Sequence, residues 1–241
     1  MPRFFAEHFD PGHPAITGPD AEHIRKSLRM TAGERLTVCD TLGNDYHCRI
    51  VDTADGVVLL SVEEIRPSDS EPGVAVTLFQ CLPKGDKLET IIQKSVELGV
   101  TDIVPVLSSR CISRPDEKSM SKKLIRYAKI SASAAGQSGR GIIPAVRPLL
   151  SFREMAGKLS GFDRALFFYE GGGAPLRSLL TGTEKSLALI IGPEGGFDAA
   201  EKELAVASGA AVAGLGRRIL RTETAPLAAL TGVMLLTGNL E

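Results

Sequence analysis

The sequence lacks the segments that would place it in or across a membrane. No apolar stretch of the 241-residue chain approaches the roughly 20 residues that span a bilayer. The first residues, Met1-Pro2-Arg3-Phe4-Phe5, have no apolar core of a signal peptide. We therefore expect a cytoplasmic protein with no membrane partner.

With 43% hydrophobic and 24% charged residues, the chain can form one large domain or two modest ones.

Cysteine and histidine are few, and neither has the spacing of a metal site. The cysteines form no C-x-x-C pair and lie at Cys39, Cys48, Cys81 and Cys111. This spread fits reduced thiols in core or surface positions, not a disulfide framework or a zinc site. The histidines gather near the N-terminus without ligand spacing, at His8, His13, His23 and His47. We expect no bound metal.

The chain also lacks the excess of lysine and arginine that non-specific nucleic-acid coating requires, because its net charge is −1. The net charge conceals an uneven distribution of basic and acidic residues along the chain. Residues 1–71 hold 7 basic and 13 acidic residues, whereas residues 84–147 hold 12 and 6. This asymmetry leaves room for a local basic surface on a nearly neutral protein.

Two regions have different hydrophobic patterns. Between residues 34 and 65, short alternating apolar runs predict strands, and one short helix is expected to begin earlier, with Asp20 as its N-cap. A small β-barrel domain over residues 1–71 is the simplest solution. The polar stretch 66–73 contains proline and glycine and is typical of a linker.

From residue 72 onward, strands alternate with helices. Residues 74–82 form a near-continuous apolar run, as expected of a strand buried on both faces of a parallel sheet. A helix should follow, with Asp86 as N-cap, Glu89 completing a capping box and Gly99 at the C-terminal end. The same order recurs down to the C-terminus, which predicts an α/β domain over 72–241 with a mainly parallel sheet.

Three turns that follow strands are rich in glycine: 171–173, 192–196 and 214–216. In open parallel sheets a ligand lies beyond the carboxyl ends of the strands, and glycine lets the backbone approach it closely. One such turn can simply close a tight bend, but three at one edge indicate a pocket. No G-x-G-x-x-G pattern follows a strand with an acidic residue about 20 positions on, which argues against an α/β oxidoreductase.

The turn 192–196 has the position of a phosphate-binding loop, yet it carries Glu194 and no lysine. Asp198 and Glu201 predict a capped helix start directly after it. Because a carboxylate repels a polyphosphate and accepts hydrogen bonds, Glu194 suits ribose hydroxyls, an amine or a cation. S-adenosylmethionine offers all three and has no phosphate. Alternatively, Glu194 braces its own loop by accepting backbone N–H bonds.

The segment 215–226 carries three arginines ahead of a helix that a threonine would cap, with Pro226 in its first turn. Arg221 follows two apolar residues, which predicts that its side chain is buried and paired with Glu194 or Glu223. A functional role and structural pairing both account for this pattern.

Basic residues recur at helical spacing between residues 118 and 140, at Lys122, Arg126 and Lys129. The segment "GQSGR" should end this helix and leave Gln137 and Arg140 in a loop. Such a stripe is either a solvated face or, if the pocket belongs to an RNA enzyme, an RNA-facing surface.

Four segments occur in the same order, and with about the same spacing, as in the ribosomal RNA small subunit methyltransferase E family of the SPOUT superfamily. They are "PKGDKLETIIQKSVELGVTDIVPVLSSRC", "GQSGR", "IIGPEGGFDAAE" and "LGRRILRTETA". The opening "PRFF" and the segment "HIRKSLRM" resemble the PUA-like domain of that family, so the resemblance covers nearly the whole chain.

The resemblance implies a homodimer that uses S-adenosylmethionine to methylate the N3 atom of one uridine in small-subunit (16S) ribosomal RNA, free or in an assembled subunit. It also implies an α/β domain with a C-terminal trefoil knot, an exception to the usual rule against knots. Arg140, Arg221 and Glu194 would act in catalysis. The cofactor would be bound by Phe168, Gly192, Pro193, Glu194, Gly195, Gly196, Leu215, Gly216, Ile219, Leu220, Thr222 and Glu223. The RNA would be bound by Arg25, Lys26, Arg29, Lys84, Arg110, Lys122, Arg126, Lys129 and Gln137.

One position departs from the family pattern. Members usually carry a glutamate before the glutamine of an "EQ-x-x-R" segment, where this chain has Gly136. The glycine argues against a catalytic carboxylate at this position and loosens the helix end. Two other hypotheses fit the sequence: a SPOUT enzyme that methylates a ribose 2′-hydroxyl or a guanine, and a non-catalytic RNA-binding assembly factor.

Overall fold

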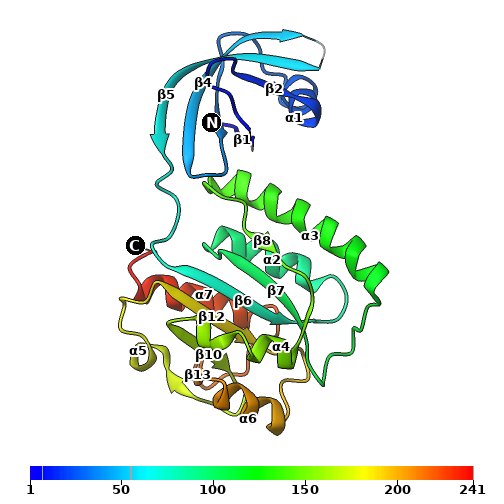
Figure 1. Cartoon of the computed structure of the whole chain (residues 1–241), viewed down its shortest axis with the longest axis vertical. Coiled ribbons are helices and arrows are strands. Elements are labelled where there is room, and N and C mark those ends of the chain that lie inside the picture. Colours follow the sequence, from blue (N-terminus) through cyan, green and yellow to red (C-terminus); the bar gives the residue numbers. More distant parts are fainter. Residues whose placement is uncertain (7, 55, 241) are drawn as a thin grey trace. The chain divides into compact units, whose positions relative to one another are not determined.

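The chain folds into two units in the computed structural model (Figure 1). The short alternating apolar runs belong to the first unit, and the long apolar runs belong to the second. The structure describes residues 1–6, 8–54 and 56–240. The first unit holds Met1–Glu71 together with Ala135–Ile143, and the second holds Pro72–Ala134 and Pro144–Glu241. The sequence pattern gave no sign that 135–143 joins the first unit.

The first unit is built on a mixed, curled sheet with the strand order β1-β3-β4-β5-β2. β1 pairs with β3 in parallel, and the other pairs are antiparallel. Register shifts in the β4–β5 pair bend these long strands, since a bulge increases local twist. Within the described residues no pairing joins β1 to β2, so the sheet is a curled half-barrel, which confirms the predicted barrel-like domain in part. The strands are β1 (Arg3–Phe5), β2 (Ala15–Thr17), β3 (Arg35–Cys39), β4 (Asn44–Ala54) and β5 (Val57–Pro67).

The helix of the first unit begins earlier than predicted. α1 (Gly18–Glu22) starts after Thr17, and the chain continues as the π-helix η1 (His23–Ser27). The assignment of Asp20 as N-cap was wrong because Pro19, whose φ is already fixed near the helical value, occupies the first turn. Ala21 and Ile24 are fully buried in the hydrophobic core against the sheet.

The second unit is built on a parallel sheet with the order β11-β13-β10-β12-β6-β7-β8, and β9 pairs with β7. Every pairing in it is parallel, which confirms the predicted sheet type. In β12 all residues from Leu187 to Ile191 are buried, as the apolar run requires. The strands are β6 (Ala75–Cys81), β7 (Asp102–Leu107), β8 (Ala145–Val146), β9 (Leu150–Ser151), β10 (Arg164–Phe168), β11 (Ala174–Pro175), β12 (Ser186–Ile191) and β13 (Ala210–Gly214).

Helices connect these strands and cover them. α2 packs against α7, α4 packs against α6, and α7 also contacts β12. Asp86 precedes α2, but only its backbone carbonyl accepts a hydrogen bond, from Glu89 at 3.0 Å, so the predicted capping box is wrong. Gly99 has the expected positive φ, +91°. The helices are α2 (Lys87–Glu97), α3 (Glu117–Ser138), α4 (Phe152–Ala156), α5 (Leu176–Leu179), α6 (Ala199–Ala207) and α7 (Ala225–Leu236), with the 3₁₀ turn η2 (Leu159–Gly161).

The path of the chain brings separate turns together. After β12 the chain forms α6 and returns as β13 on the far side of β10, so β10 lies between β12 and β13. The loop 215–224 then leads to α7, which packs against β12. Because parallel strands end at the same edge, the turns after β10, β12 and β13 are neighbours. Within the described part of the chain, no helix is both long and apolar enough to cross a membrane.

Candidate active site

A pocket of about 530 Å³ lies at the carboxyl ends of β10, β12 and β13. Its wall is formed by residues from 168–172, 191–196 and 213–222, together with Lys87 and Ala225. The three glycine-rich turns predicted to enclose a ligand therefore meet at one cavity. Its volume falls within the roughly 300–1,000 Å³ typical of small-molecule sites.

The turn 192–196 has the local structure that its sequence predicts. Gly196 has a φ of +66°, and its N–H donates to the carbonyl of Pro193 at 3.0 Å. The capping box of α6 is confirmed: the N–H of Glu201 donates to the Asp198 carboxylate at 2.7 Å, and the Glu201 carboxylate accepts from the N–H of Asp198. A helix start thus fixes the far end of the turn.

The lysine that is missing from this turn comes from α2. The Nζ of Lys87 lies 2.9 Å from Oε1 of Glu194 and 3.2 Å from Oε2 of Glu223. The Glu194 carboxylate also accepts from the backbone N–H of Lys84 at 3.2 Å. Glu194 is therefore neutralised by Lys87 of α2 and not by Arg221, its predicted partner, and the backbone N–H of Lys84 braces it.

These contacts fix the protonation state of the cluster. Partial burial raises the pKa of Glu194, but the Lys87 ammonium and two backbone N–H groups lower it by more, so the pKa lies below its ordinary value. The pKa of Glu223 is also lowered, chiefly by its own backbone N–H and then by Lys87. Both carboxylates are ionised at neutral pH and are weak proton acceptors.

Arg221 is exposed, which corrects the prediction that it is buried and paired. Within the described residues it forms no ion pair with Glu194 or Glu223, both of which contact Lys87. The segment 216–219 is exposed with it, and Ile219 is 83% exposed. Its apolar residues lie in an open loop and not in a strand, so their spacing carried no information on burial. Arg221 lines the pocket, and its exposure makes it accessible to a ligand.

The pocket gathers nearly all the predicted cofactor residues. Every one of them lines it except Glu223, which is linked to it through Lys87. The lining residues that sequence reasoning missed include Lys87, Tyr169 and Glu170. The signal for the last two was available, because they directly precede the glycine turn 171–173. Lys87 gave no local signal, since its partner Glu194 is 107 residues away.

Arg140, predicted to be catalytic, lies in the first unit. Its side chain is 3% exposed and forms a bidentate ion pair with Glu71. Nε lies 2.9 Å from Oε1 of Glu71, and Nη2 lies 2.7 Å from Oε2. Glu71 also accepts from the N–H of Gly141. Gly136 packs in the same unit, where an added Cβ would lie 3.8 Å from the Arg3 carbonyl and the Phe5 ring. Arg140 thus fastens the end of the linker to the segment after α3.

Glu71→Gln is expected to lower the free energy of unfolding by about 2 kcal/mol at neutral pH, because a buried guanidinium loses its counter-charge. Burial raises the pKa of Glu71, but Arg140 and backbone N–H groups lower it by more, so the net shift is downward. The stabilisation is therefore complete above the ordinary range of a glutamate and lost as pH falls through the folded-state pKa. Urea denaturation at several pH values measures it. A gap between wild type and variant that does not shrink in acid would contradict this account.

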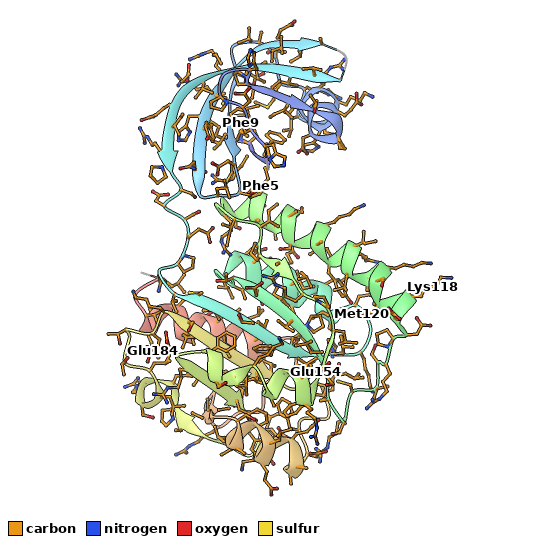
Figure 2. All side chains as sticks on the ribbon, in the orientation of Figure 1. Phe5, Phe9, Lys118, Met120, Glu154 and Glu184 are labelled. Atoms are coloured by element: carbon orange, nitrogen blue, oxygen red, sulfur yellow. The ribbon has the colours of Figure 1, made fainter. Side chains whose placement is uncertain are left out.

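The predicted RNA-binding residues lie in both units. In the first, Arg25 and Lys26 pair with Glu22, while Arg29 is exposed with a φ of +54°. Gln137 is also exposed, but it lies within α3 and not in the predicted loop. In the second unit, Lys122, Lys129 and Lys84 are exposed, Arg126 pairs with Glu89 at 2.6 Å, and Arg110 donates to the Gly195 carbonyl at 2.8 Å. Figure 2 shows Lys118 projecting outward from the start of α3.

Comparisons with known proteins identify RNA methyltransferases as relatives of this chain. A family described as an RNA methyltransferase domain matches residues 70–234, and a family described as an RNA methyltransferase PUA domain matches residues 16–62. Ribosomal RNA small subunit methyltransferase E of Bacillus subtilis is 35% identical over 226 residues, which cover 91% of this chain and 88% of that protein.

Solved structures are similar over the whole chain. The ribosomal RNA small subunit methyltransferase E of Neisseria gonorrhoeae, bound to S-adenosyl methionine, has a TM-score of 0.88 and 33% identity and covers 98% of each chain. A putative methyltransferase of Legionella pneumophila with bound S-adenosylmethionine has a TM-score of 0.86 and 29% identity, over 97% of this chain and 96% of that one.

The parallel sheet with its pocket of glycine-rich strand ends, preceded by a PUA-like sheet, defines a methyltransferase that uses S-adenosylmethionine and acts on ribosomal RNA. At this identity and coverage the particular family is also shown. The chain belongs to the ribosomal RNA small subunit methyltransferase E family.

Proposed function

We propose that the protein methylates the N3 atom of one uridine in small-subunit (16S) ribosomal RNA, with S-adenosylmethionine in the pocket at residues 168–172, 191–196 and 213–222. The observation that carries this proposal is the meeting of three glycine-rich strand ends at one cavity. The family to which the chain belongs acts on small-subunit ribosomal RNA by name. The uridine specificity rests on the resemblance of the motifs.

The lining residues fit this cofactor. Glu170 is exposed and lies at the pocket, where its carboxylate could accept from ribose hydroxyls or the amino group. The glycines at 192, 195 and 196 leave backbone groups accessible at the wall. When bound, S-adenosylmethionine supplies an electrophilic methyl group. Glu194, whose charge Lys87 offsets, shapes the turn that would hold it.

Arg221 is the residue that we propose for catalysis. The uracil N3 atom attacks only once its proton has left, which spreads negative charge over O2 and O4. A guanidinium with five donors can hold these carbonyl oxygens or a flanking phosphate. Arg221 lines the pocket and is exposed, so it is available for this contact. The lowered pKa values of Glu194 and Glu223 argue against either as the general base. The catalytic roles proposed for Arg140 and Glu194 remain predictions.

The basic stripe on α3 is proposed to contact the RNA backbone. Lys122→Ala combined with Arg126→Ala is expected to weaken RNA binding and to flatten its dependence on salt, because each lost phosphate contact lowers the slope by about 1. Filter binding of small-subunit RNA at a series of salt concentrations measures both. The matched control is Lys185→Ala with Arg153→Ala, two basic residues outside the stripe. An unchanged slope in the stripe variant would assign these side chains to a solvated face.

A homodimer, a trefoil knot and a cytoplasmic location complete the proposal. An apolar pocket beside the first is lined by Leu176, Leu235 and Leu236, and the last two side chains are 57% and 38% exposed, which suits burial by a second copy. The knot is supported by the chain path, because the loop 215–224 returns past the turn 192–196 to α7 on β12. A location where ribosomal subunits assemble follows from the substrate.

Methyl transfer from labelled S-adenosylmethionine to small subunits from cells that lack this protein tests the function. Mass spectrometry of the nucleosides should show 3-methyluridine. A methylated ribose or guanine would favour the alternative SPOUT reactions. If calorimetry detects no S-adenosylmethionine binding, the protein is an RNA-binding assembly factor and the proposal is wrong.

A further inference from the structure

A buried amide lies directly beneath the pocket. Gln80, near the end of β6, is 0% exposed and is paired in register with Ile191, the last residue of β12. Its Nε2 donates to the carbonyl of Cys81 at 3.0 Å, to the carbonyl of Gly192 at 3.5 Å and to Oγ1 of Thr222 at 3.3 Å. The Thr222 hydroxyl donates to the same Gly192 carbonyl at 2.8 Å. One side chain thus contacts two of the three segments that line the pocket.

The chemistry of this contact requires a donor. Two backbone carbonyls, of Cys81 and Gly192, face the Gln80 head group, and the Thr222 hydroxyl spends its own proton on Gly192. Three acceptors therefore lie within 3.5 Å of Nε2, and the two N–H bonds of the neutral amide are divided among them. A carboxylate there would face two carbonyl oxygens, and an apolar side chain would leave a carbonyl without part of its hydrogen bonding.

Burial of the Gln80 amide oxygen costs free energy that no hydrogen bond from the described residues offsets. Its Oε1 is buried and has no hydrogen-bond partner among the described residues. A buried polar atom without a partner destabilises the fold, so the stability of the sheet gains nothing from the amide oxygen at this position. The amide is therefore better explained by what its N–H₂ group holds than by the stability of the sheet.

We propose that Gln80 is a positioning residue for the cofactor pocket: it joins the turn 192–196 to the loop 215–222 through Gly192 and Thr222, and so sets the shape of the pocket before the ligand enters. The inference rests on the proposed function, because it takes S-adenosylmethionine as the ligand of this pocket. Gly192 and Thr222 both line the pocket, whereas Gln80 lies behind them. Pre-organisation of this kind lowers the entropy cost of binding.

Gln80→Met and Thr222→Val each remove donors at nearly constant volume. Each should raise the Kd for S-adenosylmethionine by about tenfold, the effect of losing one buried hydrogen bond. In methyl transfer, Gln80→Met should raise KM for the cofactor while kcat at saturation stays within about threefold. Both side chains hold the Gly192 carbonyl, so their effects should not add. The double variant should bind S-adenosylmethionine about as weakly as the more weakly binding of the two single variants, whereas additive effects would weaken binding about a hundredfold relative to wild type. Thr222→Ser keeps the hydroxyl and should restore nearly wild-type affinity.

The matched control is Ser131→Ala, which removes a buried hydroxyl that donates to the Pro144 carbonyl at 2.6 Å, away from the pocket in the same unit. It should lower the unfolding midpoint and leave Kd unchanged. If Gln80→Met lowers the midpoint in the same way and binds the cofactor as wild type does, Gln80 is structural and the inference fails. Fully additive effects in the double variant would also overturn it. If Gln80→Met does not fold, the comparison of Thr222→Val with Thr222→Ser tests the proposal. Equal affinities of these two variants for S-adenosylmethionine would reject it. Absence of binding by the wild type would reject the proposed function itself.

Discussion

Gly173→Ala is expected to lower the free energy of unfolding by about 3 kcal/mol and to weaken S-adenosylmethionine binding by more than about tenfold. A Cβ on Gly173 would lie 2.6 Å from the carbonyl carbon of Ala213 and 2.7 Å from the carbonyl oxygen of Val212. Both are backbone atoms of β13, which is held on its other side by β10, so neither can move cheaply. To relieve this overlap, the chain would have to break the pairing of Ala174 with Ala213 and shift the wall of the pocket.

Denaturant unfolding and calorimetry with S-adenosylmethionine measure the two effects. Gly161→Ala is the matched control, because a Cβ there meets no atom within 4 Å and its φ is not positive. It should change stability by less than about 0.5 kcal/mol. If the two variants prove equally stable, the close approach of this turn to β13 does not constrain the site.

Arg221→Lys should lower kcat by one to two orders of magnitude, roughly the loss of one preorganised donor, with little change in cofactor Kd. Lysine keeps the positive charge but loses the planar group that can hold two oxygen atoms at once. Arg221 is exposed at the pocket, so the substitution should not disturb the fold. Single-turnover methyl transfer to unmethylated small subunits measures the chemical step.

Arg153→Lys is the control for this experiment, since Arg153 is an exposed arginine of the same unit that does not line the pocket. It should retain wild-type activity. Full activity in Arg221→Lys would remove Arg221 from the mechanism, and a fall in cofactor affinity without a fall in kcat would reassign it to cofactor binding.

Local features of this chain were predicted well from sequence. The capping box of Asp198 and Glu201 formed as expected, whereas the one predicted for Asp86 and Glu89 at the same spacing did not, so spacing within one helical turn does not decide it alone. The parallel sheet followed from apolar runs that alternate with helices. The helix start at Asp20 was wrong, since Pro19 fixes the first turn. The barrel-like domain formed as a half-barrel, because bulges and strand ends decide closure and leave little trace in the sequence pattern.

The electrostatics of the site could not be predicted in the same way. The sequence offers no lysine in the turn of Glu194 and suggested Arg221 as its partner, yet Lys87 lies 2.9 Å away through a contact that spans 107 residues. Arg221 looked buried because apolar residues precede it, but its loop has no strand partner. In both cases the deciding quantity was a distance between segments that are far apart along the chain.

By itself the sequence determined which segments form strands, which turns need glycine and which family motifs the chain carries, because these depend on residues within a few positions of one another. Only the tertiary structure decided which charges pair, which arginines line the pocket and that Gln80 joins two loops 112 and 142 residues away from it. The physical reason is that hydrogen bonds and ion pairs act over about 3 Å in space, while the chain path that brings their partners together is set by the packing of the whole sheet.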